Sequence, residues 1–219
     1  MKKAFTMLEL VFVIVVVAII SAMIAPSFGG NNLREAADQL VSHIRYTQHL
    51  AMMDEKFDAS DPKWYRKRWQ IIFGKSDNSG STPDTHNQVA YSIFSDTASN
   101  STGQVDKTEI AKNPLDNTKL LSGGYSGTLD TSDEQSTREM NIGEKYGVIS
   151  YSLSGGCAWS RISFDYLGRP FKGNLASYTW TKPYQVNKLI QTACNITLSD
   201  GTKNITIAIE PETGYAHIL

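Results

Sequence analysis

The chain opens with an apolar stretch that is more uniform than anything after it. Within residues 10–25, only Ser21 interrupts the apolar side chains. The whole run from Phe5 to Phe28 has 24 residues, and as a helix it would measure about 36 Å. One such helix fits a hydrocarbon core about 30 Å thick with some tilt. The pattern therefore predicts a transmembrane helix over residues 5–28.

A second helical pattern follows Pro26, which removes a backbone donor and should break the first helix together with the glycines after it. Apolar or small side chains then recur at spacings of 4, 3, 4, 3 and 4, the repeat of one buried helix face. We therefore expect an amphipathic helix over residues 29–54, packed on a sheet and ending near Met53. The stripe consists of Leu33, Ala37, Leu40, Ile44, Thr47 and Ala51.

The remaining residues, 55–219, have the pattern of a β-rich head. Residues 205–209 alternate Ile with Thr and Ala, as a half-buried strand does. Gly201 and Gly214 supply turns that join the last three strands into an antiparallel meander. Residues 75–145 are rich in Ser, Thr, Asn, Asp and Gly, which predicts long loops around a single convincing strand. The strands expected in the head are 69–73, 89–94, 148–152, 162–164, 194–198, 205–209 and 215–219.

Together these patterns predict an α+β protein. We expect a long N-terminal helix, made of a transmembrane half and an amphipathic half, that packs on an antiparallel β-sheet head.

The charges near the start of the apolar run predict its topology. Lys2 and Lys3 precede it, and the positive-inside bias holds that end in the cytoplasm, so residues after 28 should lie across the membrane. The alternative is an ordinary signal peptide cut within residues 22–30. Glu9 argues against that alternative, because a carboxylate deep in a bilayer costs about 2–4 kcal/mol and a disposable signal has no use for it. A retained helix could use Glu9 if a cation of a neighbouring subunit met it.

Composition matters mainly for what it excludes. Basic residues number 21 and acidic ones 22, for a formal net charge of −1, which provides no global field for binding nucleic acid. Two cysteines, Cys157 and Cys194, are too few for a four-cysteine zinc site. The predicted topology places them in an oxidising compartment. We therefore expect a disulfide that closes about 38 residues, with two buried thiols as the alternative.

The first 28 residues resemble the leader and helix of type IV pilins and type II secretion pseudopilins. The resemblance is carried by Lys2-Lys3-Ala4, then Phe5-Thr6-Met7-Leu8-Glu9-Leu10 and an Ile/Val run. In that family a short basic leader is cut before a Phe, the new N-terminal Phe is methylated, and the fifth mature residue is Glu. The matching positions here are Phe5 and Glu9. The family commonly has Gly before the cut, where this chain has Ala4, and Pro26 falls where many type IV pilins have a proline that loosens the helix.

A second part of the chain resembles the same family. Ile162-Ser163-Phe164 with Gly168-Arg169-Pro170, followed by the paired final strands, is similar to the head of H-type pseudopilins and FimT-like minor pilins. The stretch 75–145 is longer than we expect for that family. The resemblance thus covers the N-terminal segment closely and the head more loosely.

The resemblance implies a structural subunit and not an enzyme. Residues 1–4 would be a leader removed by a prepilin peptidase, and the protein would be a minor pseudopilin of a type II secretion pseudopilus. The alternative is a minor type IV pilin that primes pilus assembly or binds DNA for uptake. The implied partners are other pilin or pseudopilin subunits, the inner-membrane assembly platform and the lipid bilayer. The implied location is the inner membrane, crossed once, with a cytoplasmic N-terminus and a periplasmic head that is assembled into a filament.

One dense basic-aromatic cluster could contact nucleic acid through Lys63, Arg66, Lys67 and Arg68. We favour an ordinary connection into the strand 69–73, because the rest of the head is acidic, and we expect no nucleic-acid partner.

No metal or other cofactor is expected. His43 and His49 do not share a helix face, and the acidic stretches 77–80 and 130–134 follow no complete calcium-loop spacing. No Walker loop, dinucleotide fingerprint, zinc-protease motif or nucleophile elbow is present. The sequence therefore supplies no catalytic constellation.

Overall fold

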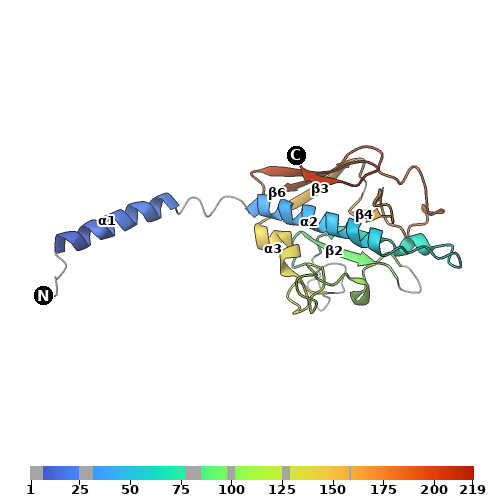
Figure 1. The fold of residues 1–219 in the computed structure, drawn as a ribbon, viewed down its shortest axis with the longest axis horizontal. Coiled ribbons are helices and arrows are strands. Elements are labelled where there is room, and N and C mark those ends of the chain that lie inside the picture. The colour runs from blue at the N-terminus through green and yellow to red at the C-terminus, as the bar shows by residue number, and fades with distance from the viewer. Residues whose placement is uncertain (1–6, 25–31, 77–84, 98–101, 125–128, 158) are drawn as a thin grey trace. The chain divides into compact units, whose positions relative to one another are not determined.

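The computed structural model describes residues 7–24, 32–76, 85–97, 102–124, 129–157 and 159–219. The chain forms two compact units, residues 1–32 and 33–219. The first contains the helix α1 (Met7–Ile24), and the second begins in the first turn of α2 (Asn32–Met53) and contains the strands of the described residues (Figure 1). The amphipathic helix therefore belongs to the head.

α2 has the buried face that its sequence repeat predicts. Its buried residues include Ala37, Leu40, Ile44, Thr47 and Ala51, and Leu33 packs against the same core. The predicted end near Met53 is confirmed. Leu40 and Ile44 are fully buried, so removing either side chain would open a cavity between the helix and the sheets.

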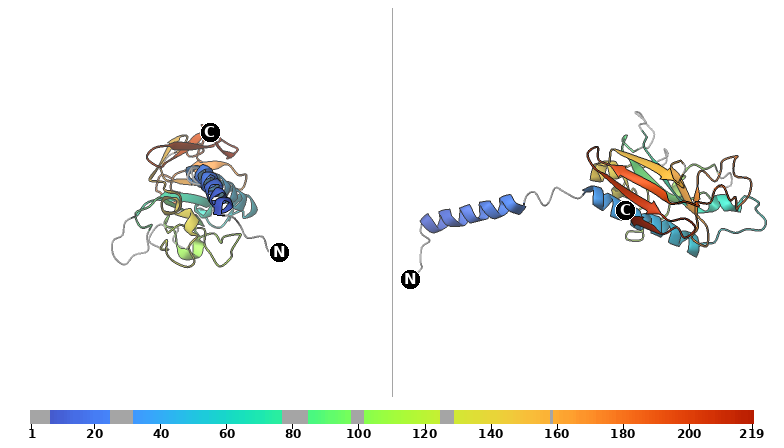
Figure 2. Two further views of the ribbon diagram at one scale, coloured as in Figure 1. Left: turned by 90° about the vertical axis from the view of Figure 1, so that its left-hand side faces the viewer. Right: turned by 90° about the horizontal axis from the view of Figure 1, so that it is seen from above.

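The head is α+β, as predicted, but its strands form two antiparallel sheets rather than one. In sheet 1 the order is β2-β1-β4-β5, and in sheet 2 it is β3-β6-β7-β8. Figure 2 shows the yellow-to-red strands of sheet 2 side by side. The strand bounds are Trp69–Gly74 (β1), Ala90–Ser95 (β2), Ser150–Gly155 (β3), Arg161–Phe164 (β4), Pro170–Lys172 (β5), Cys194–Ser199 (β6), Asn204–Ile209 (β7) and Ala216–Ile218 (β8).

Sheet 1 is buried on both faces. Ile71 and Phe73 of β1 lie in the main core, with α2 and the inward side chains of sheet 2. Ile72, which points to the opposite face because side chains alternate along a strand, joins a second cluster with Phe94 and Leu129. Loops therefore cover the face of sheet 1 that α2 leaves open.

Residues 75–145 are largely irregular, as predicted. Within their described part, β2 is the regular strand, and the other regular segments are short helical turns. Isolated bridges such as Phe94 to Ile110 attach these loops to β2. The turns in and next to this region are η2 (Trp64–Lys67), η3 (Lys107–Glu109), η4 (Arg138–Met140) and α3 (Ile142–Tyr146).

Polar side chains of α2 tie the helix to both sheets. The guanidinium of Arg45 donates to the carbonyl of Ala216 in β8, at 2.7 and 3.1 Å. The amide of Gln48 donates to the carbonyls of Gly168 and Thr213, at 2.8 and 2.7 Å. The helix therefore holds the turn after β4 and the turn after β7 together.

Candidate functional site

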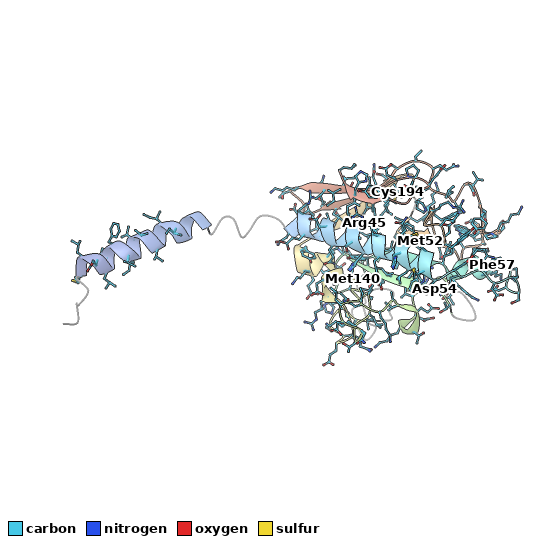
Figure 3. The ribbon with its side chains drawn as sticks, viewed as in Figure 1. Arg45, Met52, Asp54, Phe57, Met140 and Cys194 are labelled. Atoms are coloured by element: carbon cyan, nitrogen blue, oxygen red, sulfur yellow. A yellow bond between two sulfur atoms is a disulfide. The ribbon has the colours of Figure 1, made fainter. Side chains whose placement is uncertain are left out.

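α1 is apolar on every side and carries one charge. Its only charged residue is Glu9, in the first turn, where the helix dipole favours a carboxylate. The large apolar side chains between Met7 and Ile20 are 36–85% exposed, and Figure 3 shows side chains projecting all around the helix. Helices that are apolar all round are normally buried, whereas the described large apolar side chains of α1 are exposed in this structure.

The expected long helix with a transmembrane half is not supported by the structure. α1 has 18 residues, or about 27 Å of helix. Across the part of the chain that the structure describes, no helix combines the length and apolar character of a membrane span. The processing positions Ala4 and Phe5 and the helix-breaking Pro26 lie outside the described residues, so their predicted roles stay predictions.

The basic-aromatic cluster does not form one exposed face. Arg68 is only 3% exposed, and its guanidinium carbon lies 4.8–5.2 Å from the ring centres of Trp64, Phe171 and Tyr184. Burial lowers the pKa of Arg68, while the nearby Tyr184 and Asp165 act in the opposite direction. Arg68 is therefore a core cation held between aromatic rings, where no phosphate could reach it.

The other three cations of the cluster differ in exposure and in their partners. Lys67 forms an ion pair with Asp61 at 2.9 Å, Arg66 is half-buried and Lys63 is exposed. The connection leads into β1 at Trp69, as we favoured, although Trp64 and Tyr65 anchor it in a small core of their own. The four residues considered for a nucleic-acid contact therefore do not share one surface.

Cys157 and Cys194 form a disulfide, as predicted. Their Cα atoms lie 4.7 Å apart. Cys194 begins β6 on the same inward face as Ile196 and Leu198, and all three are fully buried. Gly155 of β3 is paired with Cys194 in the sheet register, so the bond fastens the end of β3 to the start of β6.

A buried hydrogen-bond network joins α2 to β2. The Gln39 amide donates to the Tyr91 hydroxyl at 2.9 Å, and that hydroxyl lies 2.7 Å from His43 Nδ1. The Tyr91 hydroxyl accepts from Gln39 and still has its own proton and a second lone pair, so the tautomer of His43 decides which of the two groups donates in their shared bond. Burial lowers the pKa of His43 to about 4, so its ring is neutral in the folded chain. His43 is thus a structural residue of the helix, as its sequence context predicted.

Asp96 is a carboxyl group buried at the end of β2. It is 1% exposed and accepts a hydrogen bond from the Gly103 amide at 2.8 Å. Burial raises its pKa to about 6, and the charge of Glu109 adds to this effect. Sequence reasoning did not find Asp96, because its burial depends on loop residues that carry no regular pattern.

The acidic loops give no metal centre in the described residues. Residues 77–80 lie outside them, while Asp130 accepts hydrogen bonds from Ser132 and Asp133 pairs with Lys107 at 3.4 Å. In the ranges that the structure describes, no group of three or more His, Cys, Asp or Glu side chains could hold a metal ion.

The structure also brings together exposed aromatic residues that the sequence did not mark. Trp159 is 80% and Tyr178 is 91% exposed, and both line one surface hollow. The only available signal was the placement of large aromatic residues among Ser, Thr and Gly, which is compatible with core or surface positions.

Comparisons with protein-family models, curated proteins and solved structures found no match to this chain. The resemblance of residues 1–28 to prepilin leaders therefore remains a prediction from the sequence.

Proposed function

We propose that this chain is a filament subunit drawn from the inner membrane, a minor pseudopilin of a type II secretion pseudopilus that helps to drive protein export. The observation that carries the proposal is the position of Glu9, the single charge of an otherwise apolar α1. A carboxylate in such a helix is costly unless a cation meets it. A role in recognising another subunit accounts for that cost.

The proposed partner of Glu9 is the N-terminal amine of a neighbouring subunit. Cleavage after Ala4 would leave Phe5 with a methylated, still cationic amine, and Glu9 would lie about one helical turn further on. In a filament whose subunits are staggered along its axis, Glu9 of one subunit faces the amine of the next. Pairing in an apolar surrounding would fix the register between subunits and draw a monomer from the bilayer into the growing filament.

The proposed topology follows from the sequence around α1. Lys2 and Lys3 would hold the N-terminus in the cytoplasm, where the prepilin peptidase and the assembly platform act on pilin-like proteins. The apolar run 5–28 would cross the membrane once, and the head would lie in the periplasm. The disulfide supports this placement, because such bonds persist in oxidising compartments.

The second candidate is a minor type IV pilin that primes pilus assembly or binds DNA. It shares the processing and the Glu9 chemistry, so it predicts the same assembly defect. The burial of Arg68 and the pairing of Lys67 with Asp61 count against DNA capture through residues 63–68.

Substitution of Glu9 tests the proposal. Glu9→Ala makes the helix more apolar, so insertion and leader cleavage should survive while incorporation into filaments, or secretion, fails. Glu9→Asp should be intermediate because its shorter side chain reaches less far. Membrane fractionation combined with an assembly or secretion assay measures both outcomes.

Glu35→Ala is the matched control. It removes an exposed carboxylate from the first turn of α2 and should assemble normally. Normal assembly of Glu9→Ala would show that this carboxylate does not mediate subunit recognition.

A further inference from the structure

A surface hollow of about 560 Å³ lies beside β4 and β5. Its walls come from the segment just before β4, which carries Trp159 and Ser160, and from the loop after β5, which carries Asn174, Tyr178 and Lys188. Its size matches that of pockets that hold small ligands.

The hollow presents two aromatic rings to solvent. Trp159 is 80% exposed and Tyr178 is 91% exposed, although large aromatic side chains usually bury most of their surface. Trp159 also has a left-handed backbone, with φ of 70°, a conformation that strains a bulky residue and persists only where the surroundings enforce it. The nearby Cys157–Cys194 bond fastens this segment to β6.

The loop that carries Tyr178 is held in place. Trp180, two residues further on, is 2% exposed and packs against Tyr65 and Phe171. The Tyr65 hydroxyl donates to the Trp180 carbonyl at 3.0 Å. Gln185 closes the loop by donating to the Thr179 carbonyl at 3.1 Å. Packing and hydrogen bonds therefore hold the loop that presents Tyr178, which lowers the entropic cost of binding there.

The polar groups of the hollow are mainly neutral. Gln104, Asn174, Ser177 and Thr179 contribute amides and hydroxyls, and no described lining residue is acidic. The loop 173–190, which forms one wall, has two basic residues and no acidic one. The hollow therefore favours a ligand that has many hydroxyl groups and a negative charge.

The two cations of the lining are not equivalent. Arg161 is 6% exposed and donates to the Asn174 side chain at 3.0 Å. Lys188 is half-buried and donates to the Thr179 hydroxyl at 2.9 Å, so it is the more accessible cation. Binding of single-stranded nucleic acid needs a row of cations along the backbone as well as stacking rings. One accessible lysine among neutral groups suits a carboxylated sugar better.

We propose that this hollow binds an acidic oligosaccharide. Trp159 and Tyr178 would offer flat apolar faces to the C–H groups of the sugar rings. The amides and hydroxyls would hydrogen-bond to the sugar hydroxyls, and Lys188 would pair with a carboxylate. This binding site is independent of the role proposed for Glu9.

Titration of the full-length protein in detergent tests the site, with tryptophan fluorescence or calorimetry as the readout. The probes are a tetramer of galacturonic acid, a neutral tetramer of galactose and a tetranucleotide of thymidine. We expect the acidic sugar to bind best. Trp159→Ala and Tyr178→Ala should each weaken its binding about tenfold or more, and Lys188→Gln should remove the preference for the acidic over the neutral sugar.

Lys182→Gln is the matched control, because Lys182 is an exposed cation of the same loop that does not line the hollow; it should bind like the wild type. Thermal unfolding verifies that each variant is folded, which is expected because both rings are exposed. Failure of both sugars to bind would overturn the proposal. So would binding that survives both aromatic substitutions, or tighter binding of the oligonucleotide.

Discussion

His43 and Asp96 are buried titratable residues. Burial lowers the pKa of His43 and raises the pKa of Asp96. His43 has a pKa lowered from 6.5 to about 4 and is neutral in the folded chain. Asp96 has a pKa raised from 3.8 to about 6, so in the folded chain its carboxyl group stays protonated to a higher pH. Each shift makes the free energy of unfolding depend on pH, with opposite signs.

The two groups should offset each other between about pH 4 and pH 6. The contribution of His43 is complete above pH 6.5 and is lost as the pH falls towards 4, because the unfolded chain then binds more protons. The contribution of Asp96 is complete below pH 3.8 and is lost as the pH rises through 6. We therefore expect the following in this window. The free energy of unfolding of His43→Gln, measured as a difference from the wild type, should fall as the pH rises. The same difference for Asp96→Asn should increase as the pH rises.

Urea unfolding at several pH values and constant ionic strength measures how the free energy of unfolding changes with pH. One titrating group can contribute at most about 1.4 kcal/mol per pH unit to that slope. Gln at position 43 can still accept from Tyr91, and Asn at position 96 can still accept from Gly103, so both variants should fold. Curves that run parallel to the wild type from pH 4 to 6.5 would contradict the assignment.

Arg68 should matter for stability and not for binding. Removing its guanidinium leaves a gap among Trp64, Phe171 and Tyr184, so Arg68→Ala should lower the free energy of unfolding by about 2–4 kcal/mol. Lys63→Ala, at an exposed position, should stay within about 0.5 kcal/mol of the wild type. Chemical denaturation separates the two, and equal small effects would show that the buried cation contributes nothing.

At the level of elements, the disulfide is a covalent constraint on sheet 2. It links residues 37 apart in sequence, and in the chain-entropy model such a loop contributes about 4 kcal/mol. Reduction should therefore lower the free energy of unfolding by roughly that amount.

Urea unfolding with and without reductant checks this expectation. The paired variant Cys157→Ala with Cys194→Ala should match the reduced wild type and should not respond to reductant. Free thiols in the protein taken from its native compartment would contradict the bond.

The strands that the sequence predicts well are those with clear alternation or a clear apolar run. The repeat of Ile205, Ile207 and Ile209 corresponds to β7, and the meander of β6, β7 and β8 is as expected. β5 was missed because it has only three residues and begins with Pro170, which strand patterns disfavour.

The separation into two sheets was also missed. It depends on β4 pairing with β1, which lies some 90 residues earlier, and alternation within a strand does not determine its partner. The site residues show the same limit. The burial of Arg68 was not predicted, because its aromatic neighbours Phe171 and Tyr184 are distant in sequence.

For the whole molecule, processing is the sharpest test of the family resemblance. If the leader is recognised, intact-mass analysis of protein from the native membrane should show a chain that begins at Phe5 and carries one methyl group on its amine. A matched chain with Phe5→Pro should keep its leader. A start within residues 22–31 would instead indicate an ordinary signal peptide.

The interleaved strand order affects how the chain can be made. β3 is followed in sequence by β4 and β5, both of which join the other sheet, and its own partner β6 starts about 40 residues after it ends. At a synthesis rate of about 5–20 residues per second, roughly 2–8 s therefore pass between the synthesis of β3 and that of its partner β6. During that interval its Ser-rich, uncharged edge is open to pairing with other nascent chains. The incomplete chain, with β3 made and β6 not yet made, is consequently the species that a chaperone would need to protect. A ribosome stalled before residue 194 would carry a head in which only sheet 1 has all its strands.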